Sequence, residues 1–210
     1  MSSGGDKLTK VKICGLKREE DILYVNELQP DYVGFVFTKS TRQIDRYKAK
    51  ELIDILDKNI KKVGVFLNNS FEEVNEIAKY CSLDILQFHG DESPIYCDQF
   101  DYEVWKAFRI RNQTSLKELE EYTVSGFLLD TFEKGQYGGT GKIFNWDLVS
   151  DINKDKFVIL AGGLKSENVK KAIQTVNPHV VDLSSGIEVN GVKNFEKIKK
   201  IIEIVRGKYE

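Results

Sequence analysis

Three side chains that can transfer protons or bind anions stand directly after apolar runs. Cys14 follows residues 11–13, His89 follows residues 84–88, and Asp130 follows residues 126–129. A thiol and a carboxyl that face one ligand can both exchange protons with it. The two histidines of the chain are too few and too far apart in sequence to suggest a histidine-based metal site. Each residue also has a plainer interpretation. Cys14 could be a small buried hydrophobic residue, Asp130 an acidic residue that caps a helix or a turn, and His89 a histidine inside the barrel whose hydrogen bonds are made within the protein.

Two short turns late in the chain are suited to binding an anion. Gly162 and Gly163 follow the apolar run at 157–161, and Ser184, Ser185 and Gly186 follow the apolar run at 180–183. Backbone without a Cβ can approach a ligand closely and direct N–H groups at it. Either turn alone is compatible with a simple change from strand to helix. The pair, on two successive strands, predicts a shared phosphate site.

The elements that must position these residues alternate between strand and helix along the whole chain. Strict alternation favours parallel strands with helical crossovers. Eight such units predict an α/β fold, a single (β/α)8 TIM barrel, rather than a doubly wound open sheet, because the glycine-rich turns follow strands seven and eight and not strand one. The expected strands lie at 11–15, 32–37, 61–67, 84–90, 103–109, 126–131, 156–163 and 180–186.

Helical periodicity and capping signals occupy the intervening segments. Apolar residues with helical spacing predict helices around 49–56, 169–176 and 195–205, and Gly207 marks the end of the last one. Ser70 with Glu73, and Ser115 with Glu118, resemble capping boxes. The segment 92–99 is poorly patterned. Residues 131–142 contain four glycines, which predicts either a mobile lid or a plain surface loop.

Composition limits the class of protein. The chain has 210 residues and a net charge of −2, and this charge does not favour binding to nucleic acid, which is itself negatively charged. It has no apolar run long enough for a membrane span and no secretory signal. Its three cysteines match no zinc or disulfide framework, so we expect reduced thiols and a cytoplasmic location. Residues 1–9 are expected to form a disordered or tag-like lead-in, and residues 10–210 the catalytic barrel.

Strand alternation also predicts a buried ion pair. Lys12 shares a face with Cys14, and Asp182 shares a face with Ser184. Strands one and eight become neighbours when the barrel closes, and an ammonium inside a barrel needs a partner. We therefore predict a Lys12–Asp182 pair below the site, with its positive charge favouring the Cys14 thiolate.

Several motifs, taken together, resemble one enzyme family. They are KICG (12–15), VGFVF (33–37), KSTR (39–42), VGVF (63–66), LQFHGDE (86–92), LLDT (128–131), YGGTGK (137–142), LAGGL (160–164) and VDLSSGIE (181–188). In this order and spacing the chain is similar to phosphoribosylanthranilate isomerase over residues 11–206. The resemblance implies a tryptophan-biosynthesis enzyme that performs an Amadori rearrangement of N-(5-phosphoribosyl)anthranilate by proton transfers alone, so we expect no metal and no organic cofactor.

The resemblance also implies roles for particular residues. It places the general base on Cys14, the general acid on Asp130, and the contact to the anthranilate carboxylate on Arg42. For this chemistry the pKa of Cys14 must be lowered and that of Asp130 raised. Gln43 stands where an aromatic residue is common in the family, which leaves the pose of Arg42 open. Further substrate contacts are expected from His89, Gly162, Gly163, Asp182, Ser184, Ser185 and Gly186.

Three other functions stay open at this point. The histidine-pathway isomerase performs the same rearrangement, but it resembles two duplicated half-barrels with an aspartate at the position of Cys14. A Schiff-base aldolase would use Lys106. A non-catalytic sugar-phosphate-binding protein would not need Cys14 and Asp130 together. In each case the expected partner is a small-molecule substrate, and the chain is expected to be a monomer or a weak homodimer.

Overall fold

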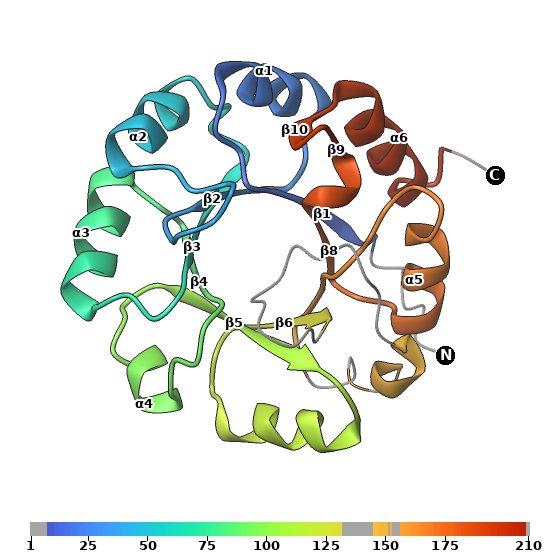
Figure 1. The fold of residues 1–210 in the computed structure, drawn as a ribbon. Coiled ribbons are helices and arrows are strands. Elements are labelled where there is room, and N and C mark those ends of the chain that lie inside the picture. The colour runs from blue at the N-terminus through green and yellow to red at the C-terminus, as the bar shows by residue number, and fades with distance from the viewer. Residues whose placement is uncertain (1–7, 132–144, 151, 153–155, 209–210) are drawn as a thin grey trace, which may run out of the picture.

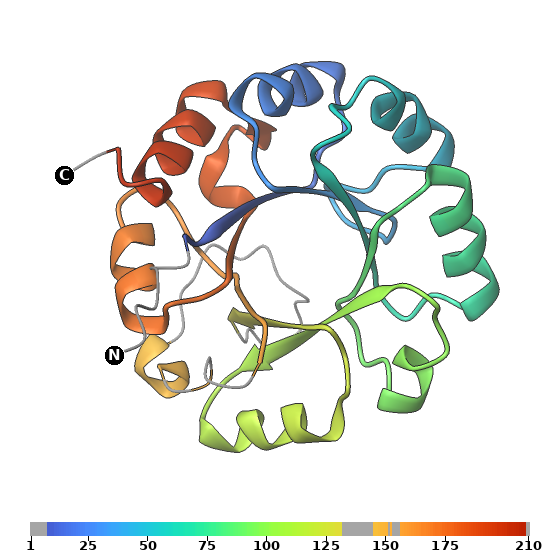
Figure 2. The same cartoon turned by 180° about the vertical axis from the view of Figure 1, so that it is seen from behind.

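The computed structural model of the chain describes residues 8–131, 145–150, 152 and 156–208. Eight parallel strands form a closed barrel in the order β1 to β8, and β8 pairs with β1. Figure 1 shows this ring of strands surrounded by helices, and Figure 2 shows the same ring from behind. The predicted (β/α)8 barrel is confirmed.

Every expected strand segment overlaps an observed strand. The strands are β1 (Lys10–Cys14), β2 (Tyr32–Val36), β3 (Lys61–Phe66), β4 (Ile85–Phe88), β5 (Glu103–Ile110), β6 (Gly126–Thr131), β7 (Val158–Leu160) and β8 (Val180–Leu183). Six of them end earlier than predicted, and β7 and β8 do so by three residues. Strand β7 ends before Gly162 and Gly163, whose φ angles of 84° and 64° leave the extended region. Strand β8 ends before a 3-10 turn, η4 (Ser185–Ile187).

The helices lie outside the strands. They are α1 (Glu19–Leu28), α2 (Arg46–Asp54), α3 (Phe71–Cys81), α4 (Pro94–Cys97), α5 (Val169–Val176) and α6 (Phe195–Val205), with 3-10 segments η1 (Gln113–Glu121) and η2 (Trp146–Val149). A two-stranded hairpin, β9 (Glu188–Val189) and β10 (Val192–Lys193), follows η4. Helices begin or end where the sequence signals predict: Ser70 caps α3 through the Glu73 N–H, and Gly207 follows α6 with a φ of 70°.

One predicted helix start is wrong. Ser115 does not cap a helix, because Asn112 accepts the N–H groups of Thr114 and Ser115 at the start of η1. The Ser115 hydroxyl instead accepts the Arg111 N–H at 3.2 Å. An asparagine three residues earlier offers the same kind of acceptor oxygen, and here it is the residue with the extended backbone that a cap requires.

Alternation along the strands separates two cores. Inward side chains, among them Tyr32, Ile85 and Trp105, fill the barrel, while a larger apolar layer packs between strands and helices. Aliphatic and aromatic residues close the lower barrel, and polar residues stand above them at the carboxyl ends of the strands. The fold therefore places Cys14, Asp130 and Asp182 at one end of a filled barrel.

The ends of the chain and the glycine-rich segment lie partly outside this description. Thr9 donates its hydroxyl to the Pro178 carbonyl at 3.0 Å, which ties the start of β1 to the loop before β8. The division into a lead-in at 1–9 and a barrel at 10–210 stays a prediction. Most of the predicted lid at 131–142 lies outside the described residues. Within the described ranges, no helix has both the length and the apolar character needed to span a bilayer.

Candidate active site

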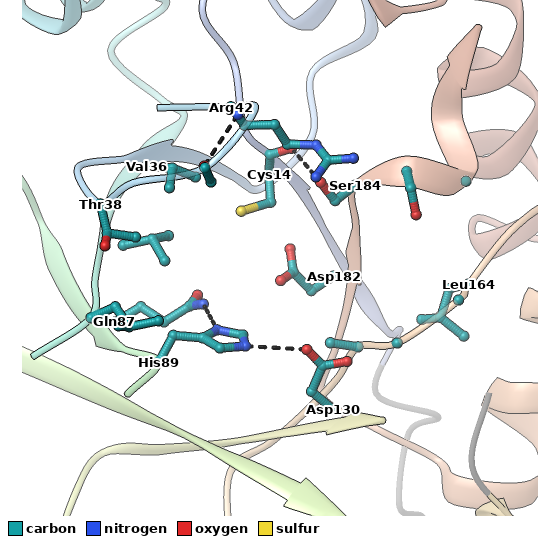
Figure 3. A pocket seen from close by; sticks show the side chains of 18 of the residues that line it. Cys14, Val36, Thr38, Arg42, Gln87, His89, Asp130, Leu164, Asp182 and Ser184 are labelled. Atoms are coloured by element: carbon teal, nitrogen blue, oxygen red, sulfur yellow. Dashed lines mark hydrogen bonds and ion pairs between the residues drawn. The ribbon is translucent and has the colours of Figure 1, made fainter. Parts of the chain in front are cut away.

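A cavity of about 420 Å³ opens at the carboxyl ends of the strands. Every predicted site residue lines it, and Figure 3 shows Cys14 and Asp130 pointing into it from opposite sides, with Asp182 between them. The structure therefore brings together the residues that were predicted for the isomerase site. The predicted lining residues are Cys14, Arg42, His89, Asp130, Gly162, Gly163, Asp182, Ser184, Ser185 and Gly186.

The predicted ion pair lies beneath Cys14. The Lys12 ammonium donates to Asp182 Oδ1 at 3.0 Å, and the two residues are also register partners of β1 and β8. Lys12 is fully buried. Burial is the largest single influence and opposes the charge, but Asp182 and Cys14 together outweigh it and raise the pKa of Lys12. The prediction is confirmed, and Lys12 carries a positive charge below the thiol.

The predicted lowering of the Cys14 pKa is wrong for this structure. Burial is the largest influence and raises the pKa of the thiol. Lys12 and Lys193 act in the opposite direction, while Asp182 adds to the rise. Burial wins because the negative charge of Asp182 partly cancels the cation on which the prediction rested. The two lysines nevertheless make the thiolate less costly than burial alone would.

Arg42 reaches the cavity but already holds a carboxylate. Its Nε and Nη2 donate to the two oxygens of Glu188 at 2.8 and 2.7 Å, and Lys193 donates to Glu188 at 2.7 Å. Burial opposes the charge of Glu188, but the hydrogen bond from Arg42 and the charge of Lys193 lower its pKa to about 2. Gly15, with a φ of 84°, leaves the space in which the Arg42 side chain lies, since a Cβ there would come within 2.6 Å of Arg42 Cδ.

Asp130 stands on the other side of the cavity in a hydrogen-bonded chain. Its Oδ2 lies 3.1 Å from His89 Nε2, and its Oδ1 accepts the Thr131 N–H at 2.7 Å. His89 Nδ1 in turn lies 3.1 Å from the Gln87 amide nitrogen. Asp130 is buried, and Gly162 lies so close that a Cβ there would come within 2.8 Å of Asp130 Oδ1. His89 is thus positioned to act on Asp130 rather than to fill the core.

The two predicted anion-binding turns lie against each other. Gly186 packs so tightly on the Leu164 carbonyl that a side chain there would collide with it. The Ser184 hydroxyl donates to the Cys14 carbonyl at 3.2 Å and joins the ends of β8 and β1. Gly186 thus lies against the segment that follows Gly163, and both glycines line the cavity.

Lys106 does not reach this cavity. It lies on the outer side of β5, where its ammonium is 3.3 Å from Glu92 and donates to the carbonyls of Gly90 and Ala107. Glu92 also accepts the N–H groups of Asn68 and Gly90. A Schiff-base role would require this lysine to leave a buried ion pair, so the geometry speaks against the aldolase alternative.

Comparison with known proteins gives the family. The family model for N-(5'phosphoribosyl)anthranilate (PRA) isomerase matches residues 11–204. The chain belongs to the PRA isomerase family. An N-(5'-phosphoribosyl)anthranilate isomerase from Thermoanaerobacter sp. (strain X514) is 53% identical over 201 residues, which cover 95% of this chain and 99% of that protein. The isomerase activity of this family in tryptophan biosynthesis is the activity of the chain.

Solved structures of PRA isomerases share the fold. Monomers of the dimeric enzyme from Thermotoga maritima match with a TM-score of 0.85 and 36% identity, covering 95% of this chain and 99% of that one. A PRA isomerase in complex with reduced 1-(o-carboxyphenylamino)-1-deoxyribulose 5-phosphate matches with a TM-score of 0.83 and 34% identity, with the same coverage.

Sequence reasoning missed three residues of this PRA isomerase site. Gln87 could have been found, because it lies two residues before His89 on the same face of a strand. Glu188 stands within a family motif, but nothing in the motif indicates that it pairs with Arg42. Lys193 gave no signal, because its contact depends on the hairpin β9–β10 folding back on η4.

Proposed function

We propose that the chain converts N-(5'-phosphoribosyl)anthranilate into 1-(2-carboxyphenylamino)-1-deoxyribulose 5-phosphate with Cys14 as general base and Asp130 as general acid. The observation that carries the assignment is that a thiol and a carboxyl enter one cavity from opposite sides. A flat ring between them would present its oxygen to one group and a C–H bond to the other.

The proposed steps balance without a further reactant. Asp130 gives its proton to the furanose ring oxygen, the bond between that oxygen and the anomeric carbon breaks, and an iminium forms. The Cys14 thiolate then takes the proton from the neighbouring sugar carbon, and the C–H electron pair gives an enol-amine. The protonated Cys14 thiol returns its proton to the anomeric carbon of the enol-amine, and the enol hydroxyl gives its proton to the Asp130 carboxylate, so that the ketone forms and both groups return to their starting states. Positioned acids and bases of this kind each contribute about 10²–10⁴-fold in rate.

The charged ends of the substrate fit opposite parts of the cavity. Gly163, Ser185 and Gly186 line the cavity, and the backbone of such turns can direct N–H groups at a phosphate. Arg42 keeps one edge of its guanidinium for a second carboxylate, because Glu188 uses only Nε and Nη2. Binding at both ends would hold the sugar between Cys14 and Asp130.

One assay tests the proposed activity. Purified protein mixed with freshly formed phosphoribosylanthranilate should cause the anthranilate-type fluorescence to disappear at a rate proportional to enzyme concentration. The corresponding histidine-pathway substrate, offered under the same conditions, should not be turned over. An unchanged fluorescence signal with folded wild-type protein would refute the proposal.

We further propose that the chain works in the cytoplasm as a monomer or weak homodimer. Cys14, Cys81 and Cys97 are all unpaired, as expected of a reducing compartment. The Thermotoga maritima relative is described as dimeric. Sedimentation velocity over a hundredfold range of concentration tests this, because a weak dimer dissociates on dilution and an obligate one does not.

A further inference from the structure

Gln87 lies at the floor of the cavity with one end of its amide satisfied and the other end without a partner. It is 1% exposed and lies at the end of β4. The amide nitrogen lies 3.1 Å from His89 Nδ1, but Oε1 has no hydrogen-bond partner among the described residues. Figure 3 shows this oxygen directed into the cavity, away from His89.

A buried amide oxygen without a partner is unusual in a folded protein. Leaving such an acceptor without a donor destabilises the folded state, so nearly all buried polar atoms have a partner. Within the described ranges only one other buried side-chain polar atom, Trp146 Nε1, shares this condition. Since Gln87 lines the cavity in which the substrate is proposed to bind, a donor on the substrate is the natural partner for Oε1. The proposed substrate carries sugar hydroxyl groups, and a hydroxyl donates to a carbonyl oxygen.

The nitrogen end of the same amide constrains His89. An amide N–H can only donate, so Nδ1 must accept, and the proton of the neutral ring then sits on Nε2. In this tautomer Nε2 donates to Asp130 Oδ2, 3.1 Å away. The remaining oxygen, Oδ1, is then the one left to carry the acid proton, and its existing contact is the Thr131 N–H.

We infer that Gln87 is a bifunctional positioning residue: its Oε1 accepts a hydrogen bond from a sugar hydroxyl of the substrate, while its Nε2 fixes His89 as the Nε2–H tautomer that orients Asp130. This inference rests on the proposed function, since it names a further contact of the same site. Binding of the sugar would hold the amide in the orientation that His89 requires. Only a side chain with an acceptor end and a donor end can perform both tasks.

Other charged groups share the cavity and bear on its protonation. Cys14 and, beneath it, Lys12 lie on β1, Asp182 lies on β8, and Arg42 enters from the loop after β2. None of them has a hydrogen bond to Gln87 or His89 in the described part of the chain. The ring of His89 therefore has Gln87 and Asp130 as its hydrogen-bond partners in that part of the chain, and an amide N–H at Nδ1 with a carboxylate at Nε2 both favour the proton on Nε2.

Two substitutions separate the two ends of the amide. Gln87→Met keeps the length of the side chain and removes both hydrogen bonds, so KM should rise about tenfold and kcat should also fall at least tenfold. Gln87→Glu keeps an acceptor for the sugar but cannot donate to Nδ1, so KM should stay within about threefold while kcat falls at least tenfold. Gln99→Met, on an exposed glutamine, is the matched control and should leave both constants unchanged.

Nitrogen-15 NMR of the histidine rings tests the tautomer without any turnover. The chain has two histidines, and His179 is an internal reference because its Nδ1 accepts the Val158 N–H at 3.1 Å. At neutral pH the wild-type spectrum should show His89 protonated on Nε2 alone. In Gln87→Glu the Nδ1 of His89 should also be protonated at that pH, while the His179 signals stay in place and report that the variant is folded.

The outcomes distinguish this inference from the proposed function. Wild-type protein that does not turn over phosphoribosylanthranilate refutes the proposed function, and the NMR result then still decides the tautomer. An active wild type with an unchanged KM in Gln87→Met refutes the sugar contact. A wild-type His89 protonated on Nδ1, or an unchanged kcat in Gln87→Glu, refutes the positioning role.

Discussion

The two sides of the cavity surround their proton carriers with different kinds of partner. Cys14 lies among full charges, with the Lys12–Asp182 pair beneath it and Lys193 close enough to act on its pKa. Asp130 lies at the end of a chain of hydrogen bonds through His89 to Gln87. A thiol must become an anion to act as a base, so nearby cations help it. A carboxyl that gives up and regains a proton is better served by a donor that stays in place in both states.

Removing either proton carrier tests the proposed roles of Cys14 and Asp130 most directly. Cys14→Ala and Asp130→Asn should each lower kcat by about 10²–10⁴-fold, because each removes one acid or base and little packing. Steady-state fluorescence assays measure the loss, and circular dichroism checks the fold. Cys97→Ala, at a buried thiol outside the cavity, is the matched control and should keep the wild-type kcat. Near-normal turnover in Cys14→Ala would show that the base lies elsewhere.

The charged side should respond strongly when its ion pair is broken. Lys12→Met leaves Asp182 buried without its cation and should lower the free energy of unfolding by about 3–5 kcal/mol, as for other broken buried pairs. Asp182→Asn added to Lys12→Met should cost little more, because the uncompensated charge is then gone. Urea unfolding of the two single variants and the double variant measures the coupling. Fully additive losses would contradict it.

The same substitution sharpens the electrostatic account of the base. Burial raises the pKa of Cys14 and Lys12 lowers it, so loss of Lys12 leaves the thiol harder to ionise. The limb of the pH profile of kcat/KM that reports the thiol should therefore move to higher pH in Lys12→Met. Thiol alkylation rates measured against pH give the ionisation of Cys14 independently. A limb that moves to lower pH would reverse the assignment of charges.

Arg42 tests whether the charged side also binds substrate. Arg42→Met should raise KM about tenfold to hundredfold and change kcat much less, since a charged hydrogen bond contributes about 1.5–3 kcal/mol to binding. Initial rates over a range of substrate concentrations separate the two constants. Arg46→Met, on the outer helix α2, is the control and should leave KM unchanged. A pure loss of kcat would make Arg42 a participant in proton transfer instead.

Glu188 should give a smaller, acid-dependent effect on stability. Its pKa is lowered to about 2 in the folded chain from an ordinary value near 4.5, so its contribution is present above pH 4.5 and is lost as the pH falls toward 2. Glu188→Gln should therefore show a weaker decline in unfolding free energy between pH 4.5 and pH 2 than the wild type. Thermal melts at closely spaced pH values measure this. If stability falls equally in the wild type and in Glu188→Gln between pH 4.5 and pH 2, Glu188 makes no pH-dependent contribution to stability.

Removal of metal ions should leave the activity unchanged. The proposed steps use only protons from Cys14 and Asp130, so extensive dialysis against EDTA should leave kcat and KM at their starting values. Activity that falls on dialysis and returns with an added divalent cation would refute the acid–base scheme as written.

The parts of the site that follow from strand geometry were predictable from the sequence. Alternation and barrel closure placed Lys12 beside Asp182, and the order of apolar runs placed Cys14 and Asp130 at one end of the barrel. Contacts made by turns were not predictable. Arg42 meets Glu188 because η4 leads into the hairpin β9–β10, whose first residue is Glu188, and no periodicity in the sequence encodes that turn. The pKa of Cys14 was missed because it depends on a balance between burial and charges of both signs.

The pair between Lys12 and Asp182 also has a consequence for how the chain comes to be folded. Its two members are separated by 170 positions, so the first strand is made long before the partner of its buried ammonium leaves the ribosome. Until then Lys12 has to stay in water, and β1 cannot take its final place without the cost of an uncompensated charge. Burial of Lys12 therefore depends on the last strand. A nascent or truncated chain that lacks Asp182 cannot close the barrel around a paired Lys12, so closure is favoured only once all eight strands are present.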